Sequence, residues 1–365
     1  MDALPLIPAR PAPTPTHGLW LRLRRSLFAS AGSTVLTLAL LAATLWLVPQ
    51  LWSWGVVHAV FERNADACQA ARDNGACWGV IAEKYRVILF GGYPFDEQWR
   101  PLAATALLLT LLVFSCLRVA WRRWLILAWV VVLALFVALM GGGVAGLTPV
   151  PTQQWGGLPL TLLLASASSA LAFPLSVLIA LGRRSELPAI RAVCTGYVEL
   201  VRGVPLISVL FMASFLFPLL LPVGASPDVL LRVLAGITLF AAAYMAEIVR
   251  GGLQAIPRGQ IEAAHALGLG YWRTQRLVVL PQALATVLPG LMNNFIGIFK
   301  DTSLVTVVSL YELTGAAGMA LAGDPTWRPF KVEAYLLIAA IYFAFCFAMS
   351  RYSLRVERSL KRTHD

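Results

Sequence analysis

The chain has 365 residues, of which 59% are hydrophobic and only 13% are charged. A soluble domain has about a quarter of its residues charged, because its surface must face water. The composition therefore excludes a soluble enzyme, a disordered protein and a fibre, and it indicates an integral membrane protein. The net charge of +11 agrees with basic segments on the cytoplasmic side of a membrane, so we expect no nucleic-acid partner.

Eight stretches are long and apolar enough to cross a bilayer as helices, which takes about 20 apolar residues each. In chain order they lie at about 31–52, 101–119, 125–146, 158–181, 203–222, 229–246, 284–309 and 332–350. They predict an all-α, polytopic membrane protein with about eight transmembrane helices. Most Lys and Arg residues fall on the inner side if both termini face the cytoplasm, where basic residues accumulate in membrane proteins.

Cys68 and Cys77 lie in the first outer segment, between the first two spans. They form a disulfide if this segment faces an oxidising compartment, and they remain free thiols otherwise. No C-x-x-C pair occurs among the five cysteines, so we expect no metal site. The sequence also lacks the phosphate-binding loop G-x-x-x-x-G-K-[ST], and we expect no ATP hydrolysis by the chain itself.

The polar segment 247–282, between the sixth and seventh spans, carries the most information about function. Helix-forming residues follow Pro257, which suits a first helical turn. Gly268 and Gly270 are expected to break this helix. A second helical stretch, 271–280, is expected to end at Pro281. The sequence therefore predicts a helix, a glycine turn and another helix on the cytoplasmic side.

The first of these helices has a surface suited to docking. Ala263 and Ala264 let another protein approach the backbone closely, and Glu262 lies near a helix start, where the helix dipole favours a carboxylate. Glu262-Ala263-Ala264 is followed at fixed spacing by Gly268, Val278 and Leu280-Pro281. This pattern resembles the EAA motif of the permease subunits of bacterial ABC importers, which more often have Ile where this chain has Val278.

Longer stretches resemble one branch of that family, the permeases for polar amino acids. They are residues 156–185, 197–212 and 293–313, and with the EAA segment they extend over 156–350. The three further spans in front of them, with their long outer loop, resemble those of a general L-amino-acid importer permease.

This resemblance divides the chain into four parts. Residues 1–30 are expected to form a cytoplasmic tail, and 31–155 three accessory spans with a periplasmic loop at 53–100. Residues 156–350 would form a five-helix core with the type I ABC importer permease fold and its EAA loop. Residues 351–365 would form a basic cytoplasmic tail. The location implied is the bacterial inner membrane, with several passes through it and both termini cytoplasmic.

The resemblance also implies an assembly. Two copies of a cytoplasmic ABC ATPase would use ATP and Mg, while this chain binds no cofactor of its own. They would receive the EAA loop at its motif residues Glu262, Ala263, Ala264 and Gly268. A second homologous permease subunit, or a copy of this chain, would complete the path through the lipid bilayer. A periplasmic binding protein would deliver L-amino acids to that path.

Six polar residues of the seventh span are candidates for the solute path: Asn293, Asn294, Lys300, Asp301, Thr302 and Ser303. Charged residues inside a span are costly and usually functional. The carboxylate of Asp301 suits the ammonium group or the side chain of a passing amino acid. The alternative is that Lys300 and Asp301 lie near an interface and only stabilise packing, and that the two asparagines bond to neighbouring helices.

Two other pairs of charged residues are expected to have a structural role. Glu247 with Arg250, and Glu199 with Arg202, lie at span ends, where salt bridges are expected.

Three other classes of function stay open. A secondary carrier or channel would need no ATPase, although the chain shows no internal repeat of the kind found in such carriers. An ABC permease for another small polar solute is a further alternative. A membrane enzyme is the weakest, because we find no catalytic constellation.

Overall fold

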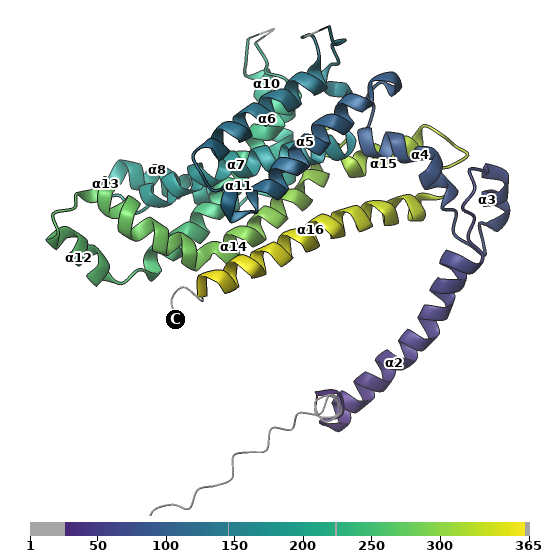
Figure 1. Cartoon of the computed structure of the whole chain (residues 1–365), viewed down its shortest axis with the longest axis horizontal. Coiled ribbons are helices and arrows are strands. Elements are labelled where there is room, and N and C mark those ends of the chain that lie inside the picture. Colours follow the sequence, from purple (N-terminus) through teal and green to yellow (C-terminus); the bar gives the residue numbers. More distant parts are fainter. Residues whose placement is uncertain (1–25, 145, 223–224, 362–365) are drawn as a thin grey trace, which may run out of the picture. The chain divides into compact units, whose positions relative to one another are not determined.

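The computed structural model describes residues 26–144, 146–222 and 225–361 (Figure 1). The regular secondary structure of this part of the chain is helical, apart from two isolated β-bridges that join Val60 to Cys77 and Gly157 to Glu312. The chain divides into two compact units, Met1–Trp78 and Gly79–Asp365. Most of the tail expected at 1–30, and the last residues of the tail expected at 351–365, lie outside the described residues.

The first unit is a single long helix followed by a small disulfide-bonded segment. Helix α2, Ala31–Trp52, begins at Ser30, whose hydroxyl accepts a hydrogen bond from the amide of Ser33. None of its residues is buried in the described structure, which is expected of an apolar helix whose side chains face lipid. The π-helix η1, Ser53–Val57, and helix α3, Ala65–Ala71, follow it.

The second unit contains the remaining helices. Their bounds in chain order are α4 Gly79–Phe90, η2 Phe95–Glu97, α5 Trp99–Ser115, η3 Arg118–Ala120, α6 Trp124–Gly141, η4 Thr152–Gln154, α7 Gly157–Gly182, α8 Pro188–Arg202, α9 Leu206–Phe211, η5 Met212–Leu216, α10 Phe217–Leu219, α11 Val229–Ala255, α12 Arg258–Ala266, α13 Tyr271–Thr274, η6 Gln275–Val279, α14 Leu280–Asp301, η7 Thr302–Val308, α15 Leu313–Ala322 and α16 Lys331–Lys361. The outer segment expected as a loop at 53–100 is therefore largely helical, and α16 extends into the expected C-terminal tail.

Seven helical segments of the described chain are long and apolar enough to cross a membrane. They are Ala31–Val57, Phe95–Ser115, Trp124–Gly141, Gly157–Gly182, Val229–Ala255, Tyr271–Val308 and Lys331–Ser359. Each contains one of the expected spans or most of it. The described chain has eight spans only if a bent pair of helices, Pro188–Arg202 and Leu206–Leu219, counts as one.

The expected continuous span at 203–222 is wrong in its first residues. Helix α8 ends at Arg202, and the helical stretch from Leu206 leaves it at an angle of 106°. Pro205 causes the break, because it has no amide proton and disfavours a helical conformation of the residue before it. Pro205 has an extended backbone, with ψ of 143°, and α9 starts directly after it.

The core of the second unit is formed where α7, α11, α14 and α16 pack beside one another (Figure 1). Small residues allow close contact between these helices, as is usual in membranes. At Gly252 of α11, an added Cβ would lie only 2.6 Å from the carbonyl oxygen of Ala283 in α14. The two helices on either side of the EAA helix are therefore in backbone contact.

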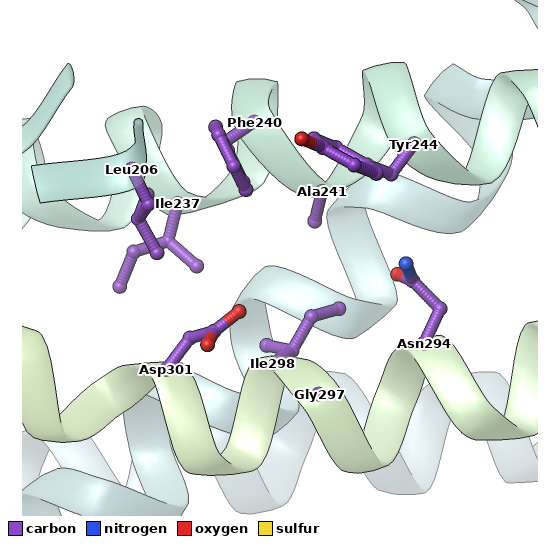
Figure 2. A pocket seen from close by; sticks show the side chains of 9 residues that line it. All are labelled: Leu206, Ile237, Phe240, Ala241, Tyr244, Asn294, Gly297, Ile298 and Asp301. Carbon is purple, nitrogen blue, oxygen red and sulfur yellow. The ribbon is translucent and has the colours of Figure 1, made fainter. Parts of the chain in front are cut away.

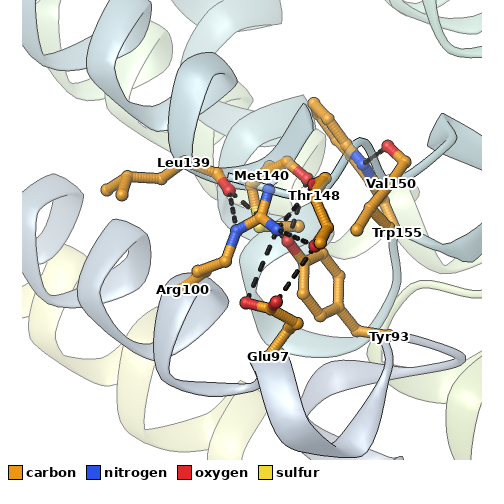
Figure 3. A network of polar contacts seen from close by, with 8 residues as sticks. All are labelled: Tyr93, Glu97, Arg100, Leu139, Met140, Thr148, Val150 and Trp155. Atoms are coloured by element: carbon orange, nitrogen blue, oxygen red, sulfur yellow. Dashed lines mark hydrogen bonds and ion pairs between the residues drawn. The ribbon is translucent and has the colours of Figure 1, made fainter. Parts of the chain in front are cut away.

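A buried arginine joins the accessory helices α5 and α6 (Figure 3). Arg100 is fully buried, and its Nε donates to the carbonyl of Leu139 at 2.7 Å. Its Nη1 donates to the carbonyl of Thr148 at 2.9 Å and lies 3.7 Å from the carboxylate of Glu97. The first contact satisfies a carbonyl at the C-terminal end of α6, which has no partner inside the helix. The second holds the segment that follows α6.

Candidate functional site

The EAA residues lie on a short helix that stands between two long ones. Helix α11 ends at Ala255, and α12 runs from Arg258 to Ala266. The expected loop 247–282 is narrower in the structure, because its first residues belong to α11. The expected end of the second helical stretch at Pro281 is also wrong. Pro281 lies in the first turn of α14, where a missing amide proton costs no hydrogen bond, so the helix continues.

The motif residues divide between a buried and an exposed face of α12. Ala264 is only 3% exposed, and α12 packs against α13 and η6. Glu262 and Ala263 are exposed. Gly268 has φ of +76°, and its amide donates to the carbonyl of His265 at 2.9 Å. A residue with a Cβ is strained in that conformation, so the glycine is required where the chain leaves α12.

Large apolar side chains are exposed beside the motif. Leu267 is 81% exposed and Trp272 is 70% exposed. Exposed apolar groups beside charged ones are typical of a surface that another protein covers. In Figure 1 α12 lies at the opposite end of the second unit from α4 and α15. The arrangement is thus a short helix with an exposed face at one end of the second unit.

A cavity of about 240 Å³ lies between α9, α11 and α14 (Figure 2). Its lining residues are Leu206, Ile237, Phe240, Ala241, Tyr244, Asn294, Gly297, Ile298 and Asp301. The volume is below the range of about 300–1,000 Å³ for drug-sized ligands, so it suits a smaller solute. The walls are mostly apolar, and the polar groups are concentrated on α14 and at Tyr244.

Two of the six candidate path residues line this cavity. Asn294 and Asp301 are seven residues apart on α14, so they share one face of the helix. The Oδ1 atom of Asn294 is buried and has no hydrogen-bond partner among the described residues. An unpaired buried polar atom is costly, and a bound solute would offset that cost. A carboxylate and an amide thus face the same apolar space.

The other four candidates lie outside the cavity lining. Asn293 and Lys300 are exposed. The hydroxyl of Thr302 is buried and donates to the carbonyl of Phe299 at 2.8 Å, and that of Ser303 donates to the carbonyl of Lys300. The sequence analysis did not predict that α11 lines the cavity. Phe240 and Tyr244 are four residues apart, which is the spacing of side chains on one face of a helix.

One carboxylate is shared by three arginines near the end of α11. Glu247 lies 2.5 Å from Arg183 and 3.6 Å from Arg202, and it also pairs with Arg250. The expected pair Glu247–Arg250 is present. The expected pair Glu199–Arg202 is wrong. Arg202 pairs with Glu247 instead, because α8 packs against α11.

The ion cluster adjoins the cavity. The guanidinium carbon of Arg202 lies 5.6 Å from the ring centroid of Tyr244, which is a lining residue. Arg183 follows α7 directly, Arg202 is the last residue of α8, and Arg250 lies on α11 with Glu247. The shared carboxylate therefore joins α11 to α7 and α8 at this end of the cavity. Displacement of any one helix would break a contact of Glu247.

Cys68 and Cys77 are joined by a disulfide in the first unit, with their Cα atoms 5.3 Å apart. The indole of Trp78 donates to the carbonyl of Gly55 at 2.7 Å, so the residue after the second cysteine is held against η1. Among the described residues, no group of His, Cys, Asp and Glu is arranged to hold a metal ion.

Comparison with known proteins decides the family. Residues 172–362 match the model of the binding-protein-dependent transport system inner membrane component. The chain belongs to this family. It is 45% identical to the inner membrane amino-acid ABC transporter permease protein YhdY of Escherichia coli K12, over 96% of this chain and 95% of that protein. The expected family is thereby confirmed.

Two further relatives show how far the similarity extends in this family. The chain is 37% identical to the glutamate/glutamine/aspartate/asparagine transport system permease protein BztC of Rhodobacter capsulatus, over 98% of both chains. It is 32% identical to a solved amino acid ABC transporter with histidines, over 56% of this chain and 92% of that one, with a TM-score of 0.50. The expected all-α permease fold is therefore confirmed.

Proposed function

We propose that this chain is the membrane-spanning subunit of an ATP-driven importer that moves L-amino acids from the periplasm to the cytoplasm. The observation that carries the proposal is helix α12, on whose exposed face Glu262 and Ala263 lie, in a chain with a permease fold. The amino-acid class is supported by the names of relatives that match this chain over nearly its whole length.

The partners follow from this role. Two copies of an ABC ATPase bind ATP and Mg and receive α12. A second homologous permease, or a copy of this chain, completes the path through the membrane. A binding protein delivers the amino acid to that path. The chain lies in the inner membrane with both termini in the cytoplasm. The disulfide between Cys68 and Cys77 supports a periplasmic position for its segment, since disulfides persist in oxidising compartments.

The direct connection of α12 to the cavity through α11 supports this proposal. Helix α11 carries the cavity residues Ile237 and Tyr244, then Glu247 of the ion cluster, and it ends three residues before α12 begins. ATP-driven movement of α12 therefore acts on a helix that forms one wall of the cavity. Asp301 and Asn294, on the opposite wall, provide the carboxylate and amide that bind the polar groups of the solute.

The test is uptake by the whole complex. We would express the chain with the neighbouring transporter genes of its own organism, and measure uptake of radiolabelled L-glutamate, L-glutamine, L-histidine and L-arginine with and without ATP depletion. We expect ATP-dependent uptake and co-purification of an ATPase, both lost in Glu262→Ala. Glu186→Ala, an exposed carboxylate outside α12, is the control. Uptake that survives ATP depletion would instead support a secondary carrier.

A further inference from the structure

A buried carboxylate outside the cavity connects several helices. Glu312 is fully buried and precedes α15. Its Oε1 accepts hydrogen bonds from the amides of Thr314 at 2.9 Å and Gly315 at 3.0 Å. These are the contacts of a helix N-cap, which satisfy amides that have no partner inside the helix.

Three hydroxyl groups from three other elements approach the same carboxylate. Thr306 of η7 donates to Oε1 at 3.2 Å, and Tyr342 of α16 donates to Oε2 at 2.8 Å. The hydroxyl of Thr161 in α7, which is also 3.1 Å from the carbonyl of Gly157, lies 3.4 Å from Oε2. A buried carboxylate is costly without such donors, and hydrogen bonds to a charged acceptor are among the stronger ones. Glu312 therefore fixes η7, α7, α15 and α16 relative to one another.

Two short routes lead from Glu312 to the cavity. Along the chain, η7 begins at Thr302, directly after Asp301, and its Thr306 is held by Glu312. Through space, the ring of Tyr342 lies 5.2 Å from that of Phe299, measured between centroids. Phe299 is buried in α14, immediately after the lining residue Ile298. Both routes end at the Asp301 end of α14.

We propose that Glu312 is a positioning residue for the solute cavity, which acts by fixing the end of α14 that carries Asp301. It touches no solute itself. Loss of its contacts lets the Asp301 end of α14 move relative to the α11 wall, so the affinity for the solute falls. This inference rests on the proposed transport function, and it adds a residue that determines how well the cavity binds.

Two variants distinguish a role of Glu312 in positioning the end of α14 from a role in capping α15 alone. Tyr342→Phe removes one hydroxyl, leaves the ring against Phe299, and leaves the N-cap of α15 intact. Glu312→Gln keeps one acceptor for the N-cap amides, but it removes the charged acceptor to which Tyr342 donates. The control is Lys84→Met, which removes a different anchor of the α15 region, the 2.7 Å contact between Lys84 and Asp324.

The first measurement is uptake of the four labelled amino acids by the whole complex in membrane vesicles. We expect KM to rise about tenfold in Tyr342→Phe and in Glu312→Gln, the change that corresponds to loss of one charge-assisted hydrogen bond. The maximal rate should change less than twofold, and Lys84→Met should keep the wild-type KM. Unchanged KM values in both variants, or a loss of maximal rate alone, would overturn the proposal.

The second measurement needs no transport. Hydrogen–deuterium exchange of the purified complex reports the backbone of residues 294–308. We expect faster exchange there in Tyr342→Phe and Glu312→Gln but not in Lys84→Met. Unchanged exchange in Tyr342→Phe and Glu312→Gln would contradict the positioning role. If the wild-type complex takes up none of the four amino acids, the proposed function fails, and the exchange result alone decides the inference.

Discussion

At the scale of single residues, two neighbours on α14 have opposite surroundings. Asp301 lines the cavity with Asn294, two helical turns away, whereas Lys300 is exposed outside the lining. Adjacent residues on a helix point about 100° apart, since 3.6 residues make one turn. A charged pair in the sequence therefore becomes one residue in the cavity wall and one residue beside it.

The residue-scale prediction concerns this pair. Asp301→Asn keeps the shape of the side chain but removes its charge, so we expect KM for a transported amino acid to rise about tenfold or more, as for loss of a charged hydrogen-bond acceptor. Lys300→Gln, the neighbouring control, should keep KM within about twofold. Uptake kinetics of the two variants would check this, and equal effects of both changes would show that the cavity is not the solute site.

At the scale of elements, α12 depends on the turn that ends it. Gly268 adopts φ of +76°, and no heavy atom would contact an added Cβ within 4 Å, so strain there comes from the backbone alone. A residue with a Cβ pays about 1–2 kcal/mol in a left-handed conformation. The orientation of α13 relative to α12 is thereby set by one glycine.

We expect Gly268→Ala to weaken docking of the ATPase and to lower ATP-dependent uptake at least fivefold, because the strain is relieved by reorienting α12. Gly270→Ala is the matched control: it has φ of −71° and open space around it. Co-purification of the ATPase with each variant gives the readout. Normal co-purification with Gly268→Ala would refute the need for this turn.

A second element-scale prediction concerns the contact between α11 and α14. Gly252→Ala would place a Cβ 2.6 Å from the Ala283 oxygen, so the helices must separate. Overpacking of this kind costs about 1–3 kcal/mol. Gly251→Ala meets nothing within 4 Å and should leave stability unchanged or higher. Thermal unfolding in detergent compares the two, and equal melting temperatures would argue against the contact.

At the scale of the whole molecule, an ion pair joins an accessory helix to the permease core. The Nζ of Lys84 in α4 lies 2.7 Å from the carboxylate of Asp324, which follows α15. The hydrogen bond from Lys84 holds the pKa of Asp324 below its usual range. Since the carboxylate binds its proton less readily in the folded chain, the pair stabilises the fold above the unfolded pKa and loses this effect as the pH falls.

This gives a pH-dependent prediction. Lys84→Met should lower the melting temperature at pH 7 by a small amount, since ion pairs that solvent still reaches contribute about 1 kcal/mol or less. The difference between variant and wild type should shrink as the pH falls below the usual Asp value of about 3.9. Melting curves of both proteins at pH 7, 5 and 3.5 provide the measurement, and a difference that grows in acid would contradict the assigned pairing.

Much of the architecture could be predicted from the sequence, because membrane spans are read from local apolar composition. The EAA helix was likewise visible in the spacing from Glu262 to Gly268. The bend at Pro205 also has a local cause, the proline itself, but a count of apolar residues does not register it. The contacts of Glu247 with Arg183, and of Glu312 with Tyr342, join residues far apart in the chain, so no local pattern could reveal them.

The contact at Gly252 has a mechanical consequence. Gly252 lies three residues before the end of α11, which is about 4.5 Å along the helix axis at 1.5 Å per residue. Toward the N-terminal end of α11, Tyr244 lies about 12 Å from Gly252 and Ile237 about 22 Å from it. If α11 pivots at this contact, it is a lever with one short and one long arm. A 1 Å push at α12 then becomes about 3 Å at Tyr244 and about 5 Å at Ile237. Small movements of an ATPase would thus be amplified into opening of a cavity wall.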